Sequence, residues 1–126
     1  MASIKVSGFS SAALDYKIIY FDNQQSPTAA IQENVTGSSG KWYSVAVDNK
    51  SGNDVFVRLA DAAAPTLGTT PSDWTFFVNA NTVYNFEIPG GASFTQGLNL
   101  WTTLNAGPLD NNPPATGGCT VTVVCS

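Results

Sequence analysis

Residues 41–61 have the sequence KWYSVAVDNKSGNDVFVRLAD, and this stretch decides the fold class of the chain. Two runs within it alternate apolar residues with other residues: Tyr43, Val45 and Val47 in the first, and Val55, Val57 and Leu59 in the second. A period of two is typical of a β-strand with one buried face. The polar segment 48–54 lies between the runs and predicts the loop of a β-hairpin.

The same alternation continues along the chain, and no window of about eleven residues carries a convincing helical stripe. Strands are expected at 4–9, 15–22, 29–36, 41–48, 54–61, 74–78, 83–88, 97–104 and 120–125. Pro89-Gly90-Gly91 is expected to end the strand before it, and residues 105–118 are expected to form a long loop that three prolines stiffen. The sequence therefore predicts an all-β fold, an antiparallel jelly-roll-like sandwich of eight or nine short strands.

Length and charge exclude several classes of protein. The chain has 126 residues, which corresponds to one domain, 1–126, with residues 1–13 expected as an extended N-terminal arm. Five basic residues against nine acidic ones give a net charge of −4, so we expect no nucleic-acid partner. No apolar run approaches the roughly 20 residues of a membrane span, so we expect no membrane partner. The first residues also lack the apolar region of a secretory signal, which favours synthesis and use in the cytoplasm.

The residues that usually carry catalysis are scarce. The chain has no histidine, which excludes a Ser-His-Asp or Cys-His arrangement. Cys119 and Cys125 are expected on one strand, roughly 20 Å apart, as two thiols that no disulfide joins. Glu33 and Glu87 are the only glutamates, and the alternation around Glu87 predicts that it points to solvent. We therefore expect no enzyme activity, no metal and no cofactor.

The loop 48–54 has the oxygen-rich composition of a calcium loop but not its spacing. Counted from Asp48, Gly52 falls at the fifth position and Leu59 at the twelfth, where a calcium loop needs glycine at the sixth and a bidentate glutamate at the twelfth. Local side-chain-to-backbone hydrogen bonds of an Asx turn explain the composition without a metal.

Two tryptophans are out of phase with the predicted core. In the alternating pattern, Trp42 falls on the face opposite Val45 and Val47. Trp101 likewise falls on the face opposite its neighbouring leucines. Both indoles are therefore expected to face outward. Trp74 shares a face with Phe76 and is expected in the core. An outward tryptophan favours a contact with a partner subunit or stacking against a sugar. The third alternative is that a loop or arm of the chain itself covers the indole.

From residue 41 onward, the sequence resembles a family of small proteins from tailed bacteriophages. The segments that carry the resemblance are YSVAVDNKSGNDVFVRLADAAAPTLGTTPSDWTFFVNANTVYNFEIPGGASFTQGLNLWTT and the closing CTVTVVCS. They share with that family an order of strands and turns: a D-N-x-S strand end, a V-F-V-R-L-A-D strand, a P-T-x-G-T-T loop and a P-G-G-x-x-F-x-x-G-L turn. The resemblance spans about two thirds of the chain and includes no catalytic signature.

The resemblance implies a capsid decoration (cement) protein, a structural component of the virion surface that is assembled in the host cytoplasm. Its partner would be the major capsid protein, and the resemblance implies a homotrimer. The candidate interface residues are Trp42 and Trp101 together with Ile4, Val6 and Phe9, because the N-terminal segment is expected to reach a neighbour. Two alternatives stay open: a carbohydrate-binding module that takes a surface glycan, and a tail or fibre adhesion component.

Overall fold

The computed structural model describes residues 2–7, 17–22, 39–110, 112 and 118–126. Eight strands are found among them: β1 (Ala2–Ser7), β2 (Lys17–Asp22), β3 (Gly40–Asn49), β4 (Val55–Asp61), β5 (Trp74–Val78), β6 (Thr82–Phe94), β7 (Leu98–Thr103) and β8 (Cys119–Cys125). Within these described ranges, no helix has the length and apolarity needed to span a membrane. The strand predicted at 29–36 lies outside the described residues.

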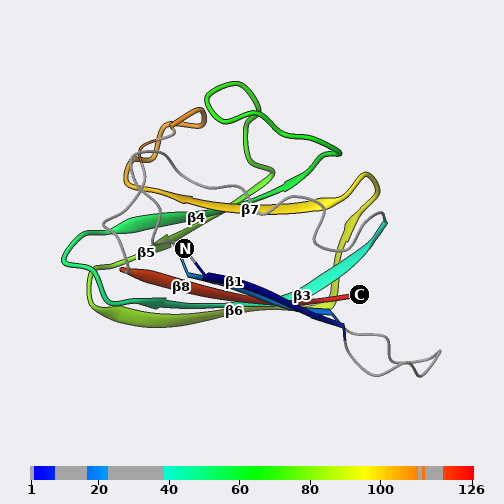
Figure 1. The fold of residues 1–126 in the computed structure, drawn as a ribbon, viewed down its shortest axis with the longest axis horizontal. Coiled ribbons are helices and arrows are strands. Elements are labelled where there is room, and N and C mark those ends of the chain that lie inside the picture. Colours follow the sequence, from blue (N-terminus) through cyan, green and yellow to red (C-terminus); the bar gives the residue numbers. More distant parts are fainter. Residues whose placement is uncertain (1, 8–16, 23–38, 111, 113–117) are drawn as a thin grey trace.

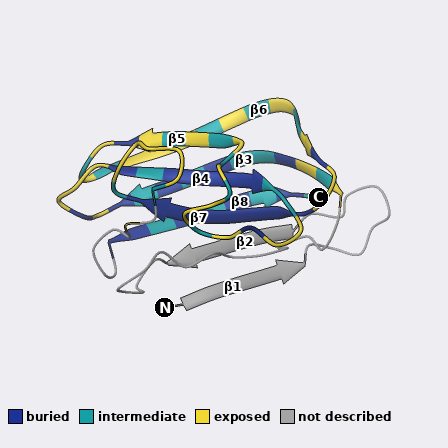
Figure 2. Ribbon diagram, turned by 90° about the horizontal axis from the view of Figure 1, so that it is seen from above, coloured by how far each residue is buried: buried dark blue, intermediate teal, exposed yellow. Residues whose placement is uncertain are grey.

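The strands form two layers, a five-stranded sheet in the order β1-β2-β8-β3-β6 and a three-stranded sheet in the order β5-β4-β7 (Figure 1). Every strand pairing in both sheets is antiparallel. The expected all-β sandwich is therefore confirmed, whereas jelly-roll connectivity stays a prediction. Strands β5 and β6 lie along one side of the sandwich (Figure 2). In the five-stranded sheet, β1 is the edge strand opposite β6.

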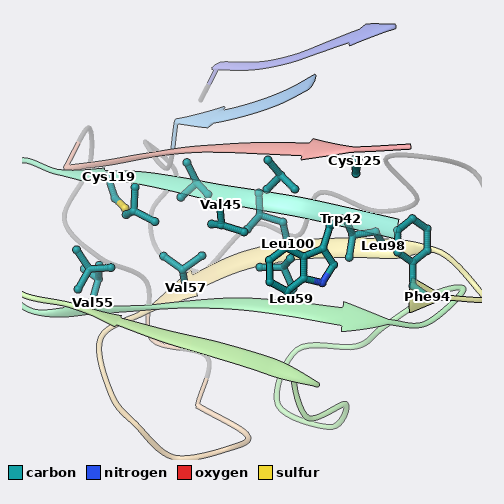
Figure 3. Packing of buried hydrophobic residues seen from close by; sticks show 14 residues of the cluster. Trp42, Val45, Val55, Val57, Leu59, Phe94, Leu98, Leu100, Cys119 and Cys125 are labelled. Atoms are coloured by element: carbon teal, nitrogen blue, oxygen red, sulfur yellow. The ribbon is translucent and has the colours of Figure 1, made fainter. Parts of the chain in front are cut away.

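The core fills the space between the two sheets, as the alternating sequence predicts. Strand β8 alternates strictly, with Cys119, Val121, Val123 and Cys125 buried and the residues between them partly exposed. Figure 3 shows buried side chains of the five-stranded sheet facing Val57 and Leu59 of β4 and Leu100 of β7. Complete burial of such a side chain contributes about 1.5–3 kcal/mol, so these alternating rows hold the two sheets together.

The outward orientation predicted for Trp42 is wrong, because β3 carries a β-bulge. Ser44 pairs with Glu87 of β6, but Trp42 pairs with Ala92, and the register shifts between the two. An irregularity of this kind breaks the strict alternation of a strand. Trp42 therefore lies on the same side as Val45, is 0% exposed and belongs to the core cluster (Figure 3).

Strand β6 does not end at Pro89-Gly90-Gly91, as the sequence predicted, but continues to Phe94. Gly90 and Gly91 have φ values of +83° and +79°, which glycine adopts without a steric penalty. A Cβ atom on Gly91 would lie 2.8 Å from Cε1 of Tyr43, so the bare glycine also makes room for that ring. The turn signal thus marks the bulge opposite Trp42, and the strand resumes after it to bury Phe94.

Trp101 does point away from the core, as predicted, but a loop of the chain covers it. It pairs with Arg58 on the outer side of the three-stranded sheet and is 2% exposed. Leu67, in the connection between β4 and β5, packs against Trp101 and Ala60. Of the three alternatives for an outward tryptophan, coverage by the chain's own loop is the one observed for Trp101.

The carboxylate of Asp61 fixes the turn that carries the chain from β6 to β7. It accepts hydrogen bonds from the backbone N–H groups of Gln96 at 2.7 Å, Thr95 at 2.9 Å and Gly97 at 3.4 Å. Partial burial alone raises the pKa of Asp61. These backbone donors together outweigh that effect, so the pKa of Asp61 lies below its usual range.

Because its folded-state pKa is lowered, Asp61 is expected to stabilise the protein above the ordinary aspartate pKa of about 3.9. This contribution is lost as the pH falls through the lowered folded value. Asp61→Asn is expected to reduce the free energy of unfolding by about 1 kcal/mol at neutral pH and to have little effect well below pH 3. Urea unfolding across this pH range measures both. The control Asp48→Asn changes an exposed ion pair with Lys50 and is expected to have almost no effect; equal losses in the two variants would contradict the prediction.

Candidate interaction surface

The structure places the predicted interface residues in different environments. Trp42 and Trp101 are buried, so neither indole offers exposed surface to a partner. Ile4 and Val6 lie in β1, whose backbone pairs with β2, and Phe9 lies outside the described residues. The contact of an N-terminal arm with a neighbour stays a prediction.

Large exposed hydrophobic side chains gather on β5 and β6 instead. Among the described residues there are four: Phe77 at 46% exposure, Val83 at 70%, Tyr84 at 38% and Leu109 at 47%. The first three belong to these two adjacent strands, which Figure 2 shows as the most exposed strands of the part coloured by burial. The alternation of β5 indicates that Phe77 faces outward, because it is out of phase with Trp74 and Phe76, which pack against the core. The predicted interface was instead placed at two tryptophans.

Phe77 and Phe56 form an aromatic pair on the outer side of the three-stranded sheet, here called the outer aromatic patch. They are direct cross-strand neighbours on β5 and β4, with ring centroids 5.2 Å apart and planes inclined by 51°. The guanidinium of Arg58 lies 6.0 Å from the Phe56 ring centroid. The patch therefore combines an exposed ring with a half-buried one, on a strand pair whose other face is core.

A chain of aromatic contacts supports the neighbouring side of the sandwich. Trp42 meets Trp74 and Phe76 edge to face, at centroid distances of 5.7 and 5.6 Å. Phe76 of β5 lies 4.6 Å from Phe86 of β6, and Phe86 lies 5.8 Å from Tyr84. Such contacts contribute about 0.5–1.5 kcal/mol each beyond the area they bury. They join the edge strands of both sheets, so β5 and β6 form one firm surface.

The loop between β3 and β4 has the predicted Asx turn. Asn49 Oδ1 accepts hydrogen bonds from the backbone N–H of Ser51 at 3.1 Å and from its hydroxyl at 2.7 Å. A shallow hollow of about 210 Å³ lies beside this loop, and its lining residues are Asp48, Asn49, Lys50, Asn81, Thr82 and Val83. The Asp48 carboxylate lies 3.7 Å from Nζ of Lys50, so a cation of the chain already sits beside it.

Glu87 is exposed on β6, as predicted, and Trp74 packs against the core cluster while remaining partly exposed. Cys119 and Cys125 stand at the two ends of β8, and both are buried. The predicted strand that holds the two cysteines is thus confirmed.

No family model matches the chain, and no curated protein matches it. Among solved structures, the chain is similar to two structures of the coat protein of Tobacco streak virus. The first has 12% identity and a TM-score of 0.41, over 97% of this chain and 83% of that one. The second, a coat protein dimer, has 13% identity and a TM-score of 0.39 over the same shares. Likeness at this level carries no argument about what the present chain binds.

Proposed function

We propose that this protein is a structural component of a tailed-phage virion that binds the outer surface of the assembled capsid and stabilises it. The observation that carries the proposal is the outer aromatic patch, where Phe77 is 46% exposed beside Phe56. A large exposed ring on a firm sheet costs little conformational entropy to bury, and such rings are typical of protein contact surfaces. The family resemblance from residue 41 onward supports the same role.

The mechanism is stabilisation by mass action. A ligand that binds the assembled shell but not the separate capsid subunits shifts the equilibrium toward the shell. Many identical copies on one particle add up, so a small patch on each copy is sufficient. The homotrimer that the resemblance implies stays a prediction from the sequence.

Protein contact is favoured over sugar binding by the shape of the patch. Stacking against a sugar ring favours a flat aromatic platform, whereas the Phe56 and Phe77 planes are inclined by 51°. The guanidinium of Arg58 near Phe56 already donates hydrogen bonds within the chain, to Thr103 and to two loop carbonyls, so these donors are not directed at a sugar. The exposed ring of Phe77 is therefore better suited to a pocket on a protein partner.

Replacing Phe77 by serine is expected to weaken binding to assembled capsids about tenfold or more, because the exposed ring would no longer fill its pocket. Co-sedimentation of the full chain with purified capsids of the tailed phage measures this, with unassembled capsid protein as a second binding target. Leu109→Ser is the matched control, since Leu109 has 47% exposure on a separate loop.

Three results would contradict the proposal: equal capsid binding by Phe77→Ser and the unchanged protein, equal binding to unassembled subunits, or no binding to capsids at all. A glycan array separates the alternative. Specific hits there, lost in Phe77→Ser and combined with no capsid binding, would replace the proposal by sugar binding.

A further inference from the structure

Strand β6 is an open edge of the five-stranded sheet. It pairs with β3 on one side, and none of the described strands pairs with it on the other. An edge strand exposes a row of backbone N–H and C=O groups, and only another extended strand satisfies that row in full. Natural edges are commonly protected by lysine, proline or a bulge.

The structure limits this open edge to residues 82–88, here called the β6 edge. Before it stands Asn81, in the left-handed conformation of a turn with φ of +55°. After it come Pro89, which has no N–H, and Gly90 and Gly91 with positive φ. A partner strand that uses the whole β6 edge must therefore stay within these limits, and their midpoint is Asn85.

Two β6 edges that are related by a two-fold rotation about Asn85 have complementary side chains. We propose that the occupant of this edge is the β6 edge of a second copy, paired antiparallel across a two-fold axis at Asn85. This register places Tyr84 opposite Phe86 of the second copy, twice, on the core side of the sheet. It also places Val83, which is 70% exposed, opposite Glu87 of the second copy on the outer side.

Charge favours this antiparallel arrangement over a parallel one. Glu87 is the only charged residue of the β6 edge. The two-fold register about Asn85 sets each Glu87 against an uncharged valine, whereas a parallel in-register pairing would set the two glutamates against each other. Like charges in directly opposite positions destabilise a strand pair, and aromatic pairs stabilise it. In the register about Asn85, the two copies therefore keep their like charges apart and bring their aromatic side chains together.

The inference is independent of the proposed capsid contact, but its dimer competes with the homotrimer that the resemblance implies, and the mass in solution decides between them. The outer aromatic patch lies on the three-stranded sheet, whereas the β6 edge belongs to the five-stranded sheet. Self-pairing is tested on the isolated protein without any capsid, so failure of one proposal leaves the other unchanged. Paired through β6, two copies would present two outer aromatic patches as one unit.

Sedimentation equilibrium of the full chain over a range of concentrations tests the pairing. The unchanged protein is expected to reach the mass of two copies. Val83→Glu places the new glutamate of each copy opposite Glu87 of the other copy. These two like-charge contacts are expected to weaken the dimer about tenfold. Adding Glu87→Lys to that variant turns both contacts into opposite-charge pairs and is expected to restore the dimer. Both effects are expected to shrink at high salt.

The control is Ser93→Glu, which adds the same charge to an exposed position of β6 beyond the bulge. Ser93 lies opposite Lys41 of β3 and Val83 lies opposite Asp48, so the rescue by Glu87→Lys is the result that separates pairing from repulsion within one copy. The Ser93→Glu variant is expected to dimerise like the unchanged protein, and circular dichroism checks that each variant is folded. A monomer at every concentration, or a mass of three copies, would overturn the inference. Equal weakening by Val83→Glu and Ser93→Glu, or no rescue by the added Glu87→Lys, would overturn it too.

Discussion

Replacing Arg58 by methionine is expected to lower the free energy of unfolding by about 3 kcal/mol. Arg58 is 1% exposed on the outer side of β4. Its Nε donates to Thr103 Oγ1 at 2.8 Å, and one terminal nitrogen donates to the carbonyls of Asn105 and Gly107, both at 2.8 Å. Methionine fills a similar volume but donates nothing, so all three acceptors lose the charged donor while the apolar packing is largely retained. The carbonyl of Gly107 keeps the N–H of Asp110, and that of Asn105 keeps the Thr103 hydroxyl.

Electrostatics explain why the guanidinium is tolerated there. Burial lowers the pKa of Arg58, and the nearby charge of Asp110 acts in the opposite direction. Asp110 itself accepts hydrogen bonds from the backbone and side chain of Asn105, so the loop that covers the guanidinium also carries its counter-charge. The loop and the arginine therefore depend on each other.

Urea unfolding measures the loss, and amide hydrogen exchange is expected to be faster at residues 104–110 in Arg58→Met. Lys50→Met is the control: its ammonium group is exposed, and replacement is expected to change stability by less than about 0.5 kcal/mol. A loss for Arg58→Met as small as the control's would show that the covering loop does not need the guanidinium.

Asn49→Asp is expected to cost about 3 kcal/mol at neutral pH, although the two side chains have almost the same shape. Asn49 is 1% exposed, and its Nδ2 faces three carbonyl oxygens: Asn53 at 2.9 Å, Asn79 at 3.1 Å and Val78 at 3.4 Å. A carboxylate would direct a negative charge at these oxygens. The amide therefore joins the β3–β4 loop to the end of β5 in a way that only a donor maintains.

The loss has a definite pH dependence. Burial against acceptors raises the pKa of the introduced carboxyl group, because the protonated form is able to donate to one of the carbonyls. The deficit is therefore expected to be full above that raised pKa and to shrink as the pH falls below it.

Thermal unfolding at several pH values measures this dependence. Asn53→Asp adds the same charge at an exposed position of the same loop and serves as the control, with an expected change below about 0.5 kcal/mol. A pH-independent deficit, or one shared by the control, would contradict the assignment of Asn49 as a buried donor.

Particular residues show how far the sequence predicts the fold. The predicted strand 74–78 matches β5, and the predicted ends of β4, β7 and β8 differ from the observed ones by at most one residue. These strands alternate without interruption and end at polar or glycine-rich turns, so local pattern was sufficient. Strand β6 was predicted too short, because Pro89-Gly90-Gly91 has the same composition whether it ends a strand or forms a bulge within one.

The candidate surface was harder to predict than the strands. Alternation correctly placed Trp101 on the outer side, but it could not show that Leu67 would return to cover it. For Trp42 the alternation itself failed at the bulge. Alternation indicated that Phe77 faces outward, but only strand order places it and Val83 on the edge strands of the two sheets on one side of the sandwich.

By itself, the sequence determined which segments are strands and which of their faces are apolar, because the period of two depends on neighbouring residues only. The tertiary structure decided which strands lie at an edge, where the register shifts and which outward rings are covered by a loop. Those features depend on pairing between residues that are far apart in the chain, such as Trp42 with Ala92 and Cys125.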